Sequence, residues 1–516
     1  MSTLSLSPEA VRNEVSLRRR FVGSAASWVR THAVSLALLT PLLAITAVVH
    51  LVGSANFPRY IDDPGTYLSQ AWSLRYEGKL SPYSYFYDHA PAGWIQIAAW
   101  ALLTDGFERY DSVMAFGTEC MLIARLATTA FIFALVRRLG FTRLTATVAT
   151  LLYALCPLAV IYGRWTYLDN IAVSWLIAAF YLATSPRRSI AAATGGFVAF
   201  AMAALSKETF LVFLPAFLWA LIQNLDRRNR SHVFAVSVFA GTLAMAMYPL
   251  FALYKGELFP GPGHNSLLET AGWQLSGRAS TGTLLDGDSA VRGLLRTWLT
   301  DDPYLLWAGL GAMFVAVLRP NVRPLALALA TGWAVMLRDG YVPFMHVIAL
   351  LPLSAILVAT AIDVLAARAG RAQRFVTTAV SLCVLAAAAA VWLTPLRNIT
   401  GQHETPNLRA ATIWAANNIP RDKQLVVHDS IWTDLVHHYG FEPRPVIVHK
   451  LDTDPAVAED VDRIDYLIVP DWYYRDKDAV YPTLLEARKH AVQVAAFGEG
   501  DDGVRIFRVS RFWNPS

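Results

Sequence analysis

Long apolar runs recur through most of this 516-residue chain. A helix needs about 20 consecutive apolar residues to cross the hydrocarbon core of a bilayer, and so many runs of that kind exceed what one soluble core can bury. Hydrophobic residues make up 55% of the sequence and charged residues only 16%, as in membrane proteins. We therefore predict a mainly α fold, a polytopic transmembrane bundle of about eleven helices. The predicted spans are residues 33–53, 113–136, 144–162, 170–184, 189–205, 209–223, 232–254, 303–318, 324–337, 344–366 and 375–396.

The distribution of arginine gives the predicted spans an orientation. Short connections on one side of the bundle are rich in arginine, and the basic N-terminal segment lacks the short apolar core and cleavage site of a secretion signal. Because basic loops stay in the cytoplasm, we expect the N-terminus inside and, with an odd number of spans, the C-terminus outside. The predicted domains are a cytoplasmic segment 1–32, a transmembrane catalytic domain 33–396 with long outer loops 54–112 and 255–302, and an extracytoplasmic domain 397–516.

The composition changes after Pro395. Short β-branched runs such as DKQLVVHDS and DYLIVP alternate with amphipathic stretches such as LRAATIWAANNI, which predicts a small α/β domain. No G-x-G-x-x-G follows any of these predicted strands, and the chain contains no Walker loop. We therefore expect no nucleotide cofactor.

Two adjacent carboxylates, Asp62 and Asp63, follow the first predicted span in the stretch RYIDDPGTYLSQAW. Neighbouring like charges raise the affinity of one carboxylate for a proton, which suits a general base. The same residues also fit an ordinary helix start, because Asp followed by Pro and a helical pattern is a common N-terminal signal. The local sequence leaves both interpretations open.

Other ionisable side chains are predicted at the outer ends of the spans. Groups this close to a bilayer edge either extend to lipid headgroups or line a polar cavity, and their common placement on the outer side favours the cavity. Cations in such a cavity suit a phosphate group. The candidates are Asp88 and His89 in YFYDHAPAGW, Arg164 and Asp169 in YGRWTYLDN, Lys207 in ALSKETF, and Arg338, Tyr341 and His346 in RDGYVPFMHVIALLP.

The order of these motifs resembles the GT-C membrane glycosyltransferases, in particular the branch of the protein O-mannosyltransferases and the lipid A aminoarabinose transferases. The resemblance covers about residues 33–396. It implies that the pair Asp62 and Asp63 supplies the catalytic base. Lys207 is similar to the family's lysine after the fifth span, and Asp169 to the acid of the preceding outer connection.

The family's motif of an aromatic residue, an acid, a lysine and two prolines falls on residues 87–91, where the match departs. His89 replaces the lysine that would hold the donor phosphate, and Ala90 replaces the first proline. In the aminoarabinose transferase branch, the motif's acid and a histidine of a later outer loop bind a metal. The resemblance therefore implies Asp88 and His264 as candidate ligands of a divalent metal, although a catalytic metal normally has three protein ligands.

Together these features predict an inverting glycosyltransferase that moves a sugar from a polyprenyl-phosphate donor to a lipid, glycan or protein acceptor. We expect it in a bacterial plasma (inner) membrane with its active site on the extracytoplasmic side, and we expect no nucleic acid partner. The alternative is a multi-span secondary transporter or lipid flippase, which predicts paired internal repeats that this sequence lacks. The expected roles are catalysis for Asp62 and Asp63, phosphate binding for Lys207, Arg164, Arg338 and His89, and substrate binding for Asp169, His346 and Tyr341.

Overall fold

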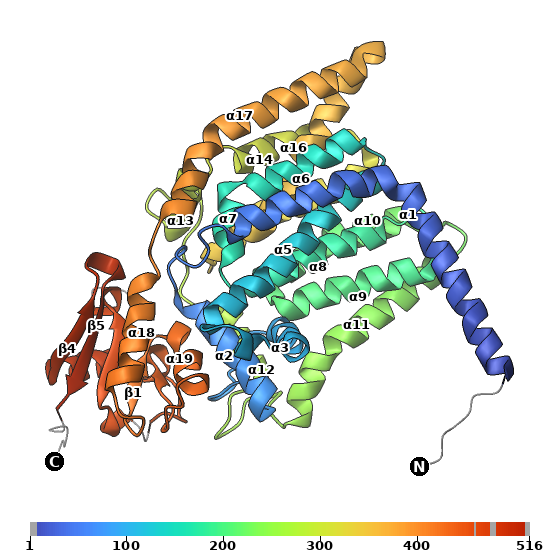
Figure 1. The fold of residues 1–516 in the computed structure, drawn as a ribbon. Coiled ribbons are helices and arrows are strands. Elements are labelled where there is room, and N and C mark those ends of the chain that lie inside the picture. The colour runs from blue at the N-terminus through green and yellow to red at the C-terminus, as the bar shows by residue number, and fades with distance from the viewer. Residues whose placement is uncertain (1–7, 459–460, 475–480, 511–516) are drawn as a thin grey trace.

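The computed structural model describes residues 8–458, 461–474 and 481–510 of the chain (Figure 1). A large body of helices makes up most of the molecule, and a smaller domain built on a β-sheet lies at one end of it (Figure 1). Helices α2 (Asp62–Glu77) and α3 (Ala92–Thr104) lie at the end of the body that faces this domain.

Each predicted apolar span is mainly helical, but the predicted span 144–162 is divided at Cys156 into two helices, and the span 209–223 begins with a 3-10 helix (Glu208–Phe213). Local signals fix several of the ends: the side chains of Thr142 and Ser189 accept hydrogen bonds from backbone N–H groups in the first turns of α6 and α9, and Pro157 begins α7. The helices of the body are α1 (Pro8–Leu51), α5 (Val113–Arg138), α6 (Arg143–Leu155), α7 (Pro157–Arg164), α8 (Leu168–Ala183), α9 (Ile190–Ser206), α10 (Leu214–Asn224), α11 (Arg230–Tyr254), α14 (Leu305–Ala316), α15 (Arg323–Val335), α16 (Val347–Ala366) and α17 (Gln373–Gly401).

The helices of the body differ in length. Among the described residues, four stretches are long and apolar enough to cross a bilayer, and a fifth qualifies if α6 and α7, bent by 58°, count as one. Helices α8, α9 and α14 belong to a shorter class of 10–17 residues. At about 1.5 Å per residue, these are shorter than a hydrocarbon core of about 30 Å. The number of spans and the sides of the two termini therefore remain predictions.

Short helices occupy both long outer loops. The first loop contains α2, α3 and the single turn α4 (Gly106–Arg109), and the second contains α12 (Leu267–Gly272) and α13 (Ala290–Asp301). Side chains of α2 and α3 belong to the same large core cluster as the helices of the body. The first outer loop is therefore packed onto the body as part of one core.

The C-terminal domain contains one five-stranded sheet in the order β2-β1-β3-β5-β4. Strand β1 is parallel to both β2 and β3, whereas β5 is antiparallel to β3 and β4. The carboxyl ends of the three parallel strands therefore meet at one edge of the sheet. The strands are β1 (Leu425–Val427), β2 (Val446–Ile447), β3 (Tyr466–Pro470), β4 (Ala491–Phe497) and β5 (Val504–Val509), and the main helices are α18 (Pro406–Asn418), α19 (Asp429–His437) and α20 (Pro482–Lys489).

Helix α19, which follows β1, docks the C-terminal domain onto the first outer loop. Asp429 Oδ2 accepts hydrogen bonds of 3.0 Å from both the backbone N–H and the hydroxyl of Thr66 in α2. Gly65 permits this approach, because a Cβ there would lie 2.3 Å from the carbonyl carbon of Asp429. One turn further along α19, Asp434 accepts a 2.7 Å hydrogen bond from the backbone N–H of Val113 at the start of α5. The carboxyl edge of the sheet consequently faces α2.

Candidate active site

A cavity of about 220 Å³ lies where the first outer loop meets the C-terminal domain. Helix α2, the start of α3 and the segment between them form most of its wall, and the segment after β2 completes it. Its mixture of aromatic and polar side chains suits a polar ligand. The lining residues are Asp63, Thr66, Tyr67, Ser69, Gln70, Ser81, Pro82, Tyr83, Ser84, Phe86, Asp88, His89, Trp94, Ile447, His449 and Lys450.

The predicted acid pair begins α2. Asp63 is half-buried and lines the cavity. The backbone of Asp62 is the first residue of the helix, but its side chain lies outside the described part of the chain. Ile61 occupies the N-cap position, which an Asp would fill in an ordinary helix start, and it makes no side-chain cap. Asp63 is therefore accessible to a ligand in the cavity, and neither Asp62 nor Asp63 occupies the N-cap position that the alternative interpretation requires.

His89 connects the cavity with buried charged residues behind it. Its Nδ1 lies 2.7 Å from Glu208 Oε1, and its Nε2 lies 3.0 Å from the ammonium of Lys207. Because an ammonium only donates, Nε2 accepts, and a neutral His89 then carries its proton on Nδ1 and donates it to Glu208. Lys207 Nζ also lies 3.9 Å from Asp169 Oδ2, and both of these side chains are only 4% exposed. The structure thus brings together three of the predicted residues, His89, Lys207 and Asp169.

The segment that carries Asp88 and His89 is held by tyrosines. The hydroxyl of Tyr85 donates a 2.7 Å hydrogen bond to the carbonyl of His89, and Tyr248 of α11 donates to the same oxygen over 3.2 Å. Tyr87 has a φ of 59°, which is uncommon for a bulky residue, and its hydroxyl donates to Glu257. Strained backbone of this kind persists only where the surroundings fix it and is concentrated at functional sites.

Lys450, which follows β2, contributes a cation from the C-terminal domain. Its side chain is 12% exposed, and its Nζ lies 3.9 Å from Asp454 and 4.3 Å from the centre of the Phe86 ring. Asp454 in turn accepts a 2.8 Å hydrogen bond from the hydroxyl of Ser84. Burial lowers the pKa of Lys450, whereas the carboxylates of Asp88 and Asp454 raise it. Both domains therefore place charged side chains on the cavity.

Tyr67 is a further polar residue of the cavity wall. It is 3% exposed, and its ring lies 5.9 Å from the ring of His89. Burial raises the pKa of the Tyr67 hydroxyl well above its usual value, and the carboxylates of Asp63, Asp169 and Glu208 raise it further. The hydroxyl therefore stays protonated near neutral pH and is available as a hydrogen-bond donor.

Arg164 does not line this cavity. It is 3% exposed and lies where the end of α1 meets α7 and α17. A guanidinium that donates to so many carbonyls has little capacity left for a phosphate. Its hydrogen bonds go to the carbonyl oxygens of Val49, His50, Val52, Phe57 and Ile399, over 2.6 to 3.5 Å.

The three candidates that precede α16, Arg338, Tyr341 and His346, do not line the cavity either. Arg338 is exposed and donates to the carbonyl of Tyr341 over 3.3 Å. The ring of Tyr341 stacks with Arg278, whose guanidinium carbon lies 3.5 Å from its centre. His346 is buried, with Nε2 2.9 Å from the carbonyl of Gly332. The structure gives these three residues local partners and does not bring them to Asp63.

The candidate metal ligands do not form a complete site. Asp88 is exposed at the cavity, whereas His264 contacts the carbonyl of Phe259 in its own loop over 3.2 Å. Within the described residues there is no group of three or more His, Cys, Asp or Glu side chains that could hold a metal ion. These residues therefore do not fit a three-ligand catalytic metal.

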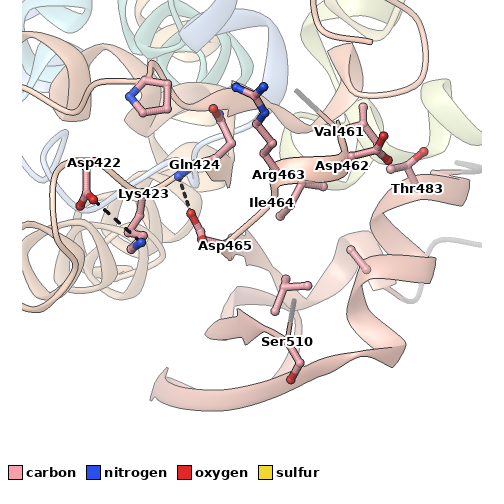
Figure 2. A pocket seen from close by; sticks show the side chains of 13 residues that line it. Asp422, Lys423, Gln424, Val461, Asp462, Arg463, Ile464, Asp465, Thr483 and Ser510 are labelled. Carbon is pink, nitrogen blue, oxygen red and sulfur yellow. Dashed lines mark hydrogen bonds and ion pairs between the residues drawn. The ribbon is translucent and has the colours of Figure 1, made fainter. Parts of the chain in front are cut away.

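A larger cavity, of about 570 Å³, lies in the C-terminal domain (Figure 2). Gln424 and Asp465, which immediately precede β1 and β3, place it at the amino ends of these parallel strands. Two of its acids have nearby partners: Asp465 accepts a 3.1 Å hydrogen bond from the backbone N–H of Gln424, and Asp422 lies 3.9 Å from Lys423 (Figure 2). Ligands of parallel sheets bind at the carboxyl ends instead, and at that edge lies the smaller cavity.

Sequence reasoning missed several residues of the cavity wall. Tyr67 and Gln70 are three residues apart, so they share one face of the helix that follows the acid pair, and this spacing was a usable signal. Lys450 follows the β-branched run PVIVH, and polar residues just after a parallel strand are a second signal. Trp94 has no comparable signal, because an isolated Trp in an apolar helix is usually a core residue.

The chain matches the family model for dolichyl-phosphate-mannose-protein mannosyltransferase over residues 89–251, a range that begins at His89 and contains Asp169 and Lys207. ArnT from Cupriavidus metallidurans, in a crystal structure bound to undecaprenyl phosphate, is 12% identical, with a TM-score of 0.60 over 94% of this chain and 100% of that chain. AglB from Archaeoglobus fulgidus, in complex with an inhibitory peptide and a dolichol-phosphate, is 14% identical, with a TM-score of 0.56 over 95% of this chain and 75% of its own.

An oligosaccharyltransferase from Archaeoglobus fulgidus in complex with Zn and sulfate is 14% identical, with a TM-score of 0.55 over 90% of this chain and 73% of that chain. No curated protein matches the chain. At these identities the likeness shows a common fold. It confirms the resemblance to the GT-C membrane glycosyltransferases that the motifs indicated.

Proposed function

We propose that this chain, which resembles the GT-C membrane glycosyltransferases in motifs and in fold, transfers a sugar from a polyprenyl-phosphate donor to an acceptor on the outer face of the membrane. One observation carries the proposal: a cavity lined by the Asp63 carboxylate lies against two buried cations, Lys207 behind His89 and Lys450. Sugar transfer from a phosphate ester needs a base for the acceptor hydroxyl and positive charge for the departing phosphate.

The proposed chemistry is a single displacement. The acceptor oxygen attacks the anomeric carbon, and the bond from that carbon to the donor phosphate oxygen breaks. The phosphate leaves with the electron pair as polyprenyl phosphate, while Asp63 or its neighbour Asp62 accepts the hydroxyl proton. Lys207 and Lys450 stabilise the charge on the phosphate, and the configuration at the anomeric carbon inverts. No step is assigned to a metal ion.

The similar proteins support this class of donor. The ArnT crystal structure contains undecaprenyl phosphate and the AglB structure is a complex with a dolichol-phosphate, and each of these lipids has the chemistry of the lipid product proposed here. The acceptor is a lipid, a glycan or a protein, and the proposed location is a bacterial inner membrane with the cavity on the extracytoplasmic side. Arg164, Arg338, Tyr341 and His346 are not assigned roles in this chemistry.

The test is sugar transfer by the purified protein in lipid nanodiscs. It is supplied with sugar-labelled polyprenyl phosphates and, as the acceptor source, a detergent extract of cell envelopes. We expect release of polyprenyl phosphate and labelling of an acceptor. Asp63→Asn and Asp62→Asn remove one carboxylate each at nearly constant size, and the variant that lacks the base should lose activity on the order of 10²-fold or more.

The matched control is Asp105→Asn. Asp105 lies in the same outer loop at the C-cap of α3 with a φ of 51°, a conformation that Asn also adopts readily. This control should transfer sugar at the wild-type rate. Wild-type activity in both acid-pair variants would refute the proposed base. In sealed proteoliposomes, movement of intact labelled donor across the bilayer without release of polyprenyl phosphate would instead indicate a flippase.

A further inference from the structure

Three buried polar atoms on the cavity wall lack hydrogen-bond partners among the described residues. They are the hydroxyl of Tyr67, Oε1 of Gln70 and the indole N–H of Trp94. Tyr67 is 3% exposed and Trp94 1% exposed. Tyr67, Gln70 and Trp94 come from two helices and therefore bring two donors and one acceptor to the wall of the same small cavity.

Such groups are uncommon in a folded protein. A buried donor or acceptor without a partner is destabilising, and most buried polar atoms are paired. Elsewhere on the same wall the polar groups do have partners: the hydroxyl of Tyr83 donates a 2.5 Å hydrogen bond to the carbonyl of Pro445, and that of Ser84 donates to Asp454 over 2.8 Å. The three open positions on α2 and α3 therefore mark where a ligand supplies the missing partners.

The chemistry of these positions fits sugar hydroxyl groups. A hydroxyl both donates and accepts, so one sugar ring satisfies Tyr67 and Trp94 as donors and Gln70 as an acceptor at the same time. The aromatic side chains of Phe86 and Trp94 also line the cavity and offer apolar surface to the ring's C–H groups. Asp63 lines the same cavity as these three residues.

The size of the cavity limits the ligand. Its volume of about 220 Å³ is below the roughly 300–1,000 Å³ of pockets that hold drug-sized ligands, so it has room for one sugar residue. We propose that Tyr67, Gln70 and Trp94 bind the hydroxyl groups of the donor's sugar residue. This inference rests on the proposed function and adds the residues that recognise the donor.

The test compares Tyr67→Phe, which removes only the hydroxyl, with the wild-type protein in nanodiscs. Two probes are titrated, polyprenyl phosphomannose and bare polyprenyl phosphate. We expect the affinity for the sugar-bearing lipid to fall roughly three- to tenfold, because one hydrogen bond to the ligand is lost. The affinity for bare polyprenyl phosphate should not change. Gln70→Met should give the same pattern through loss of the acceptor.

Tyr76→Phe is the matched control. Tyr76 lies on the same helix, is 41% exposed and donates a 3.0 Å hydrogen bond to Glu108 instead of facing the cavity. Its variant should bind both probes like the wild-type protein. Equal losses for both probes in Tyr67→Phe, or no loss for either, would overturn the sugar assignment. Tight binding of a polyprenyl-linked oligosaccharide, but not of the monosaccharide donor, would overturn the size argument.

The two proposals fail in different ways. If the wild-type protein binds neither polyprenyl phosphomannose nor any other polyprenyl phosphate sugar, the proposed function itself is refuted. If the wild-type protein binds and transfers sugar but Tyr67→Phe and Gln70→Met do not separate the two probes, only the role of these side chains is refuted.

Discussion

Lys207 and Arg164 are both buried cations that follow apolar helices, and sequence patterns alone give them the same role. The structure surrounds them differently. Lys207 meets two ionisable side chains, His89 at 3.0 Å and Asp169 at 3.9 Å, directly behind the cavity. Within the described residues, Arg164 instead donates to backbone carbonyl oxygens alone, where α1 and α17 meet α7. A cation bonded to carbonyls stabilises the fold, whereas one beside a cavity retains charge for a ligand.

The largest effect should come from Lys207→Met. Removing the charge while keeping most of the side chain's volume should lower turnover on the order of 10²-fold, because the leaving phosphate loses a preorganised cation. The measurement is release of polyprenyl phosphate at saturating donor. Since Asp169 is then left without its ion pair, the double variant Lys207→Met/Asp169→Asn separates lost catalysis from the cost of a buried charge. Wild-type turnover in the double variant would show that Lys207 has no catalytic role and would leave it, like Arg164, as a structural cation.

Arg164→Met should act on stability. It leaves several buried carbonyl oxygens without donors, which should lower the free energy of unfolding by about 3 kcal/mol or more. Thermal unfolding in nanodiscs measures this loss, and turnover per folded molecule should stay within about twofold of the wild-type value. A different result would contradict the structural role of Arg164. If Arg164→Lys unfolded at the wild-type temperature yet bound the donor weakly, Arg164 would be a ligand of the donor phosphate.

Lys450→Met tests whether the C-terminal domain shares in catalysis. We expect turnover to fall by about tenfold, because Lys450 is the more solvent-accessible of the two proposed cations and Asp454 already offsets part of its charge. Lys423→Met, in the same domain but at the other cavity, is the matched control and should be active. If both variants were fully active, the cavity would depend on the membrane domain alone.

The smallest effect concerns Asp434, which also joins two parts of the molecule. Burial raises its pKa to about 7, although hydrogen bonds from Val113 and Ser112 oppose this shift. Between about pH 4 and pH 7 the folded chain then holds a proton that the unfolded chain has released, so stability should fall as the pH rises through this window. Asp434→Asn removes the titration, and its amide oxygen still accepts from the backbone N–H of Val113 while its amide N–H donates to the hydroxyl of Ser112.

The measurement is the unfolding temperature of both proteins between pH 5 and pH 8. Arg409 and His438 also face Asp434, and burial lowers the pKa of His438, so the difference between wild type and variant is the relevant quantity. That difference should amount to a few degrees. Parallel pH curves for the two proteins would show that Asp434 does not couple docking of the C-terminal domain to pH.

Part of the site was visible in the sequence. The order of Asp63, His89, Asp169 and Lys207 along the chain predicted a shared polar region, and the structure joins the last three through hydrogen bonds and an ion pair. The same motif order also assigned Arg164 to this region, but in the structure Arg164 does not line the cavity. Whether a buried cation contacts a carboxylate or backbone carbonyl oxygens depends on which helix ends pack beside it. Short sequence motifs do not specify this packing.

The sequence by itself determined the helical body and the resemblance to GT-C membrane glycosyltransferases, because apolar run length and local motifs act over a few turns of chain. Only the tertiary structure decided which residues make the cavity. Tyr67 and Trp94 belong to different helices, and Lys450 is more than 350 positions further along the chain. They meet because α19 docks on α2 through Asp429 and Thr66 and turns the carboxyl ends of the parallel strands toward the outer loop. Long-range packing of this kind is set by the fit of two complete surfaces, which no local pattern specifies.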